Sequence, residues 1–284
     1  MSPTLHAARL GVSRGWIEFK QQLTSAQDMG FTVVSTAALV VTMYFQRDAT
    51  VPGTDISLAA ATLPGVAGLL IPFNALMGAV GALSAEREDG TLLRAKAVPQ
   101  GMVGYLVGRI VMLSITTVGA VVVMLVAGLF FVPGLLGIGL GNWLTLAWIG
   151  LLGLLSSLPI GAVIGSLAKS PQSAAGLSML TVGALTAISG IFYPIAALAG
   201  WLQTLAHAFP LYWLGLGMRS ALLPDAAAAA EIGGSWRPVE TTLVLLAWAV
   251  AGLLLAPPIL RRMARRESGS AMEERRHRAM QRVT

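Results

Sequence analysis

The sequence predicts an all-α polytopic membrane protein with six transmembrane helices, and three observations lead to this fold class. Of its 284 residues 55% are hydrophobic and only 11% are charged, with a mean hydropathy of +0.74. Residues 110–168 contain no Asp, Glu, Lys, Arg or His, and residues 56–85 are equally free of charge. A hydrocarbon core about 30 Å thick takes roughly 20 apolar residues per helix, so the longer stretch accommodates two crossings. A membrane β-barrel would need segments of about ten residues in which polar and apolar residues alternate, and the sequence has no such segments.

Six apolar runs mark the expected crossings, at residues 29–45, 63–83, 110–131, 143–167, 174–192 and 241–260. With the N-terminus in the cytoplasm, the outer segments hold only Arg47, Arg219 and Arg237 of the 19 Lys and Arg residues. Cytoplasmic loops of membrane proteins are enriched in these residues. The asymmetry therefore predicts that both termini face the cytoplasm.

The expected organisation has three parts. A cytoplasmic tail with an amphipathic helix occupies residues 1–28, the transmembrane domain occupies 29–260, and a basic cytoplasmic tail occupies 261–284. The last tail carries arginines but no aromatic residue that could stack on bases, so it is interpreted as an anchor to anionic lipid and no nucleic-acid partner is expected.

The amphipathic helix is predicted from residues 12–28, in which four apolar side chains fall on one helical face: Val12, Trp16, Phe19 and Leu23. This pattern indicates a helix that lies on the inner leaflet with Trp16 at the depth of the headgroups. Packing of the helix against the bundle is a second interpretation, and the two are compatible.

Residues 192–221 are apolar enough for a seventh crossing, but a seventh crossing would place the C-terminal arginines outside. Pro194 and Pro210 interrupt this region, and each proline removes a backbone donor and breaks a helix. Two short re-entrant helices in the outer leaflet are therefore expected, provided that protein packs around them. The seventh span is the alternative.

A charged segment, residues 86–99, follows the second predicted span. Thr91 can cap a short helix, acidic residues precede the positive end of that helix, basic residues lie near its negative end, and Pro99 stops it. Such a helix would offer Leu92 and Leu93 to a partner. A solvated loop is the other interpretation of this composition.

The order of two motifs resembles the type-2 ABC-transporter permeases. The first motif is Glu86-x-Glu88-x-Gly90-Thr91-Leu92, followed by Pro99 and by Gly108-Arg109 at the third span. The second motif is Ser189-Gly190-Ile191-Phe192-Tyr193-Pro194, followed by Trp201-Leu202, Phe209-Pro210-Leu211 and Arg219. Within this family the sequence is most similar to drug-export permeases of the daunorubicin-resistance type.

The resemblance implies a half-transporter in a bacterial inner membrane, in which two permease chains pair and sit on a dimer of ATPase subunits. Residues 86–99 would be the helix that docks on the ATPase, with coupling residues Glu86, Glu88, Gly90, Thr91, Leu92, Leu93 and Arg94. The amphipathic helix would be the connecting helix beside it. The outer gate would comprise Phe192, Tyr193 and Pro194.

The resemblance also places the substrate path along the second and fifth spans, because these spans line the path in related transporters. The candidate residues are Phe73, Asn74, Met77, Thr181, Thr186 and Ser189. Ordinary helix packing, with Thr and Ser bonding their own backbone, is the alternative. A path of this apolar kind suits an amphipathic or lipid-like substrate.

The energy source is expected to lie on another chain. The sequence contains no G-x-x-x-x-G-K-[ST] phosphate-binding motif, so no cofactor is expected on this chain, and ATP and Mg would bind the partner ATPase. An ion-coupled secondary transporter is the first alternative, but it would keep ionisable residues inside its spans, and the six predicted spans contain none. A membrane-embedded transferase is the second, but no His lies beside the acidic cluster 86–89, and no metal site is predicted.

Overall fold

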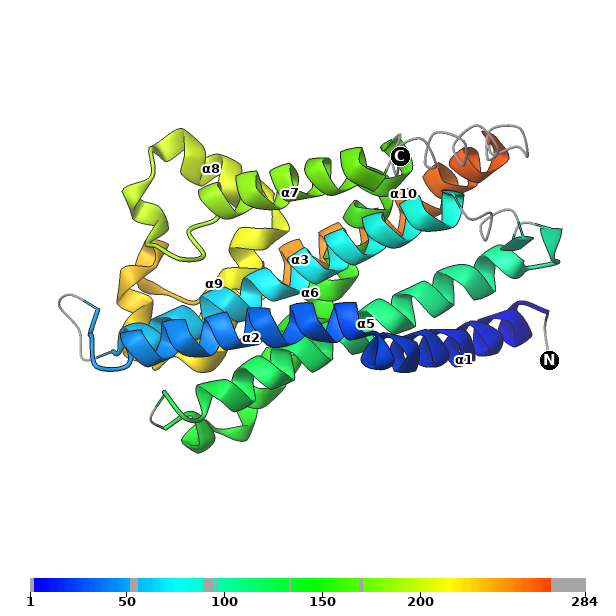
Figure 1. Cartoon of the computed structure of the whole chain (residues 1–284). Helices are drawn as coiled ribbons and strands as arrows, with labels where there is room; N and C mark the ends of the chain where they lie inside the picture. Colours follow the sequence, from blue (N-terminus) through cyan, green and yellow to red (C-terminus); the bar gives the residue numbers. More distant parts are fainter. Residues whose placement is uncertain are drawn as a thin grey trace.

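A computed structural model describes residues 3–51, 56–88, 94–95, 97–132, 134–168 and 171–266, and over these ranges the chain is a bundle of helices with no strand (Figure 1). The longer helices are α1 (Pro3–Thr24), α2 (Ala26–Gln46), α3 (Leu58–Glu88), α5 (Gly101–Gly128), α6 (Leu140–Leu167), α7 (Pro171–Ile188), α9 (Pro210–Leu222) and α10 (Pro238–Arg266). The shorter ones are η1 (Leu135–Gly137), η2 (Ile195–Ala197), α8 (Gly200–Ala208), η3 (Asp225–Ala230) and η4 (Ile232–Gly234). The all-α prediction is confirmed.

Four helices of the described chain are long and apolar enough to cross a membrane, in the segments Leu58–Gly81, Gly101–Gly128, Leu140–Ser166 and Pro238–Leu255. α2 and α7 overlap the other two predicted spans, but their apolar stretches are shorter, at Val33–Gln46 and Gln172–Ile188. A multi-pass membrane protein is therefore confirmed, and the count of six crossings stays a prediction.

The boundaries of α3 and α7 differ from those of the apolar runs for local reasons. α3 begins at Leu58, several residues before the predicted span, because the Ser57 hydroxyl accepts a hydrogen bond from the Ala60 amide at 3.1 Å and caps the helix. α7 ends at Ile188, before residue 192, because Gly190 adopts a left-handed backbone with φ of 62°.

The start of α1 and the end of α10 lie at the same end of the bundle, and α8 lies at the opposite end (Figure 1). This arrangement agrees with the expectation that both termini lie on one side of the membrane. It does not identify that side, so the cytoplasmic placement of the termini stays a prediction.

Residues 192–221 form two short helices in place of one long helix. α8 has 9 residues and α9 has 13, and both are shorter than the roughly 20 residues of a crossing. Phe209 between them is extended, and Pro210 begins α9 at a position where a missing N–H costs nothing. All of α9 except Arg219 and Ser220 is buried, so protein does enclose this helix. Its re-entrant position in a membrane stays a prediction.

The main core surrounds α9. Tyr212, Leu214 and Met218 on this helix are at most 1% exposed and pack with Ile71 of α3 and Leu152 of α6. A helix that is apolar on every side has to be covered on every side. The buried α9 therefore packs against α3, α6 and α10, which surround this one short helix.

Candidate functional site

The predicted ATPase-docking segment lies largely outside the described residues. Glu86 and Glu88 belong to the last turn of α3, whereas Gly90, Thr91, Leu92 and Leu93 lie outside the described residues. Arg94 is helical and exposed. The chain turns at Pro99 and Gln100, where Gln100 has φ of 57°, before α5 begins at Gly101. The docking role of the segment stays a prediction.

α1 is longer than predicted and lies directly against α5 (Figure 1). Its buried residues are Ala7, Gly11 and Gly15, a stripe with a spacing of four. A Cβ atom on Gly11 would lie 2.4 Å from the Gly104 carbonyl oxygen, and one on Gly15 would lie 2.4 Å from the Gly108 carbonyl oxygen. The two backbones are thus in contact, as small-xxx-small patterns permit.

Because α1 packs on α5 through its glycine face, most of its predicted apolar face points away from the bundle. Val12, Trp16 and Leu23 are 48%, 47% and 51% exposed. The structure confirms that α1 packs against the bundle, because one face lies on α5 through glycine, and it leaves the opposite apolar face exposed. Its contact with lipid stays a prediction.

Polar contacts fix the position of α1 along α5. The Glu18 carboxylate lies 2.7 Å from Arg14 Nε and 3.7 Å from Arg109 Nη1. One turn further, the Thr116 hydroxyl donates to the Gln22 side-chain oxygen at 2.8 Å. These contacts lie along the same helix pair as the glycines, so α1 is held in one register.

The path residues on α3 lie at two adjoining cavities. Phe73 and Asn74 line a cavity of 770 Å³ between α1, α2, α3 and α5. Asn74 and Met77 line a second cavity of 270 Å³. The structure therefore brings these three predicted residues together.

The path residues on α7 are absent from the described lining of both cavities. The hydroxyls of Thr181 and Thr186 donate to the carbonyls of Leu177 and Val182 at 2.8 and 2.7 Å. The Ser189 hydroxyl donates to the Thr186 carbonyl at 3.0 Å. This is the geometry expected of helix packing, and a path role for α7 stays a prediction.

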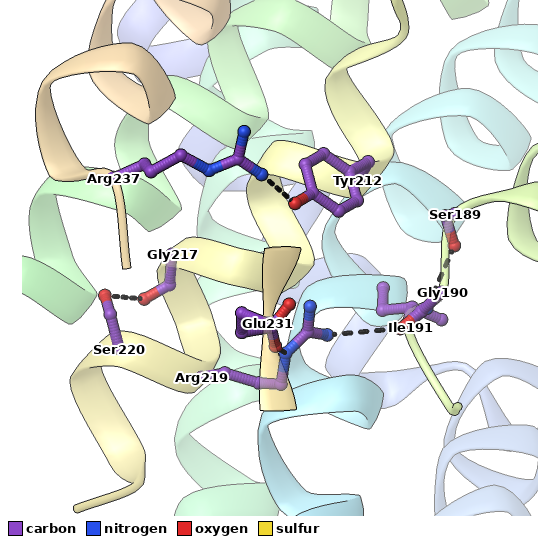
Figure 2. Close-up of polar contacts among 9 residues, drawn as sticks. All are labelled: Ser189, Gly190, Ile191, Tyr212, Gly217, Arg219, Ser220, Glu231 and Arg237. Atoms are coloured by element: carbon purple, nitrogen blue, oxygen red, sulfur yellow. Dashed lines mark hydrogen bonds and ion pairs between the residues drawn. The ribbon is translucent and has the colours of Figure 1, made fainter. Parts of the chain in front are cut away.

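Arg219 of α9 joins two outer segments (Figure 2). Its Nε donates to the Glu231 carboxylate at 2.5 Å, and its Nη1 donates to the Gly190 carbonyl at 3.4 Å. The Arg219 and Glu231 side chains are only 11% and 9% exposed. Glu231 was not identified as a site residue from the sequence, because an acidic residue in an outer loop carries no sign of its partner.

The predicted gate residues follow directly after the carbonyl that Arg219 holds. Phe192 and Pro194 are exposed, and the Tyr193 hydroxyl donates to the Ala187 carbonyl. Ile191 is buried against α3, where a Cβ atom on Gly65 would lie 2.6 Å from the Ile191 carbonyl oxygen. The loop is thus fixed by α3 on one side and by Arg219 on the other, while Phe192 stays accessible.

A second arginine organises the contact between α8 and α9. The Arg237 guanidinium donates to the Tyr212 hydroxyl (Figure 2), lies 4.9 Å from the Trp213 ring centre, and contacts His207 Nε2 at 3.5 Å. Burial lowers the pKa of His207, and the positive charge of Arg237 lowers this pKa further. This packing is typical of a structural histidine.

The described residues contain no group of three or more His, Cys, Asp and Glu side chains that could hold a metal ion. What they do present is a multi-pass helical bundle with largely apolar cavities and a buried Arg219–Glu231 ion pair. These features are those of a multi-pass integral membrane protein.

Comparison with known families is consistent with this class. The model of the ABC-2 type transporter family matches residues 7–223, and the chain belongs to this family. Members of this family are membrane-embedded transport subunits without catalytic activity of their own, and they associate with ABC ATPases. A search of curated proteins found no match.

Proposed function

We propose that this chain is the permease subunit of an ABC exporter that moves amphipathic or lipid-like substrates, such as drugs, natural products or lipids. The family match over residues 7–223 carries the proposal. The missing phosphate-binding motif supports it, because a chain without a nucleotide site needs an energy source on another chain. The sequence resemblance supports efflux as the direction of transport. It also supports a relationship to the daunorubicin-resistance permeases, which act in multidrug resistance.

The proposed assembly contains two permease chains, identical or similar, and two ATPase subunits that bind ATP and Mg. Residues 86–99 form the docking helix in this assembly, and Leu92 and Leu93 are its apolar contact residues. Glu86 and Arg94 transmit nucleotide-driven movement into α3 and α5, since the segment lies between these two helices. The assembly sits in a bacterial inner membrane with both permease termini in the cytoplasm.

The character of the enclosed space supports an amphipathic substrate. Leu39, Met43 and Leu70 lie in the 770 Å³ cavity, and its described lining contains no charged residue. A hydrophilic ion would lose its hydration there without compensation. A molecule with an apolar body and a small polar group would not.

The test is recovery of an ATPase with the permease. A Leu92→Asp, Leu93→Asp variant should still insert into the membrane but should lose the co-purifying ATPase, because charge in an apolar docking surface carries an unpaired desolvation penalty. The matched control is Leu136→Asp, a 77% exposed leucine in η1 at the opposite end of the bundle, which should retain the ATPase. Transport by a permease that never recovers an ATPase would overturn the proposal.

A further inference from the structure

The 770 Å³ cavity between α1, α2, α3 and α5 has a cluster of polar residues at one end, and most of its remaining lining is apolar apart from Ser35 and Thr36. Leu39, Met43 and Met124 are apolar lining residues. Gln22, Asn74 and Thr116 line this cavity and also the adjoining 270 Å³ cavity. The three polar residues therefore lie where the two cavities meet.

Among Gln22, Asn74 and Thr116, Asn74 is the residue without a hydrogen-bond partner in the described part of the chain. Thr116 donates to Gln22 at 2.8 Å, whereas the Asn74 side chain has no hydrogen-bond partner among the described residues. An amide that leaves water without gaining a hydrogen bond carries a free-energy penalty, which a polar group of a bound molecule would remove. Asn74 lies on a helix long and apolar enough to cross the membrane and is half-buried at the cavity wall, so its amide is accessible to a molecule in the cavity.

The length of the cavity matches one leaflet. Thr116 and Ala127 both line the cavity, and α5 rises about 16 Å between them at about 1.5 Å per residue. Half of a hydrocarbon core is about 15 Å. A single extended acyl chain that begins at Thr116 would therefore reach the opposite end of the cavity at Ala127.

The charges near the polar end select the head of such a molecule. Arg109 lies on the wall of the adjoining cavity, and the described linings of both cavities contain no Asp or Glu. The nearby Glu18 carboxylate is already paired with Arg14 and Arg109, so a cationic head would find no unpaired carboxylate there. An uncharged or anionic head would find the Asn74 amide as a donor and acceptor.

We propose that this cavity is a binding site for a single-chain amphiphile with an anionic or hydroxyl head, such as a long-chain fatty acid. The head lies at Asn74 beside Gln22 and Thr116, and the chain extends between α2 and α5 past Met43 and Met124. This site would define the substrate class of the proposed function. Only its role as a substrate site rests on that function. Binding itself does not require the ATPase.

The experiment uses the full-length permease and a palmitic acid analogue that carries a diazirine in its chain. After illumination, labelled residues are mapped by mass spectrometry of peptides. Labels are expected on cavity residues such as Leu39, Met43 and Met124. Excess palmitic acid or hexadecanol should compete for the labelling, whereas hexadecylamine should not.

Two variants connect the labelling to the cavity. Gly119 lines the cavity, and nothing lies within 4 Å of a Cβ atom placed there, so Gly119→Leu fills the chamber without a backbone clash and should abolish cavity labelling. Gly183→Leu on α7 is the matched control, because Gly183 is also surrounded by open space and lies outside the described lining. Asn74→Leu should weaken binding about fivefold to tenfold, the loss of one or two hydrogen bonds.

Proteoliposomes that contain permease and ATPase distinguish a transported substrate from a resident lipid in the cavity. Loss of cavity labelling on addition of ATP identifies a transported substrate, and unchanged labelling identifies a resident lipid; both results keep the site. Labels spread equally over lipid-facing side chains such as Leu254, or cavity labelling that survives Gly119→Leu, would overturn it. Failure to recover any ATPase would contradict the proposed function and leave the binding result intact.

Discussion

The Nε atom of Arg219 lies 2.5 Å from the Glu231 carboxylate, and both side chains are nearly buried. This contact connects α9 to the segment of η3 and η4. Because Arg219 also donates to the Gly190 carbonyl, one guanidinium holds two loops in place. The pair therefore determines the position of the predicted outer gate.

Glu231→Gln should destabilise the protein markedly. Removing one partner from a buried ion pair leaves the other charge uncompensated, which costs roughly 3 kcal/mol. The melting temperature in detergent should fall, and protease should cleave the outer loops more readily. Asp48→Asn is the control, because the Arg47–Asp48 contact at 3.0 Å is exposed and surface pairs contribute little.

Replacing both charges separates pairing from packing. Arg219→Met combined with Glu231→Leu should recover most of the stability that Glu231→Gln loses, since apolar residues of similar volume often replace a buried pair without penalty. Transport should nevertheless remain impaired in the double variant, because the Gly190 carbonyl has lost its donor. Full transport by this variant would show that Arg219 does not position the gate loop.

The contact of α1 with α5 should fail when Gly15 receives a side chain. Gly15→Val places a Cβ atom 2.4 Å from the Gly108 carbonyl oxygen, and overpacking of this kind costs about 1–3 kcal/mol. Trypsin cleavage after Arg14 and Lys20 should then accelerate. Gly30→Val on α2, where nothing lies within 4 Å, should leave cleavage unchanged, and equal cleavage of both variants would contradict the packing role.

Stability should decrease as the pH falls below the ordinary pKa of histidine, about 6.5. His207 lies in α8, outside the four helices long enough to cross the membrane. Burial lowers its pKa, and Arg237 lowers it further. In this range the unfolded chain binds a proton that the folded chain does not, so the free energy of unfolding falls with pH until the lowered folded-state pKa is reached.

Thermal melting between pH 8 and 5 measures this dependence. His207→Gln should flatten the slope below about pH 6.5, since the variant has no proton to bind. His6→Gln, at an exposed position of α1, should leave the slope as it is. An identical slope in wild type and His207→Gln would assign the pH dependence to other groups.

The helical class and the positions of the long helices could be predicted, because long uncharged stretches such as residues 110–168 have few alternatives in water or lipid. The start of α3 could not be predicted from hydropathy, because the polar Ser57 that caps the helix lies before the apolar run. The Ala7, Gly11 and Gly15 stripe was also missed. Small residues contribute no amphipathic signal, although the four-residue spacing was present in the sequence.

Contacts between distant segments limited the prediction of the site. Asn74 was predicted as a path residue because the second span lines the substrate path in related transporters. Gln22 and Thr116 line the same cavity as Asn74. They were not predicted, because the sequence does not show that their helices, α1 and α5, pack against each other. The partners of Arg219 and Arg237 lie in loops and short helices. For such segments the distribution of charges predicts the side of the membrane but not which residues are in contact.

Gly190 provides a test of the gate loop with a matched control. Its φ of 62° disfavours any side chain, and a Cβ atom there would lie 2.8 Å from Ile195 Cβ, a fully buried neighbour. Gly134 has φ of 82° but open space around it. Gly134→Ala should therefore lose only the about 1–2 kcal/mol of backbone strain, and Gly190→Ala should lose more, because Ile195 must move and shift the loop that carries Phe192 and Tyr193.

The functional consequence follows from which part of the molecule each glycine supports. Gly190→Ala should lower substrate export while the co-purifying ATPase is retained, because the loop lies at the end of the bundle opposite the start of α5. Gly134→Ala should export normally. If the two variants lost equal stability and exported equally well, the close contact with Ile195 would not position the loop, and Phe192, Tyr193 and Pro194 could not act as a gate whose geometry depends on that turn.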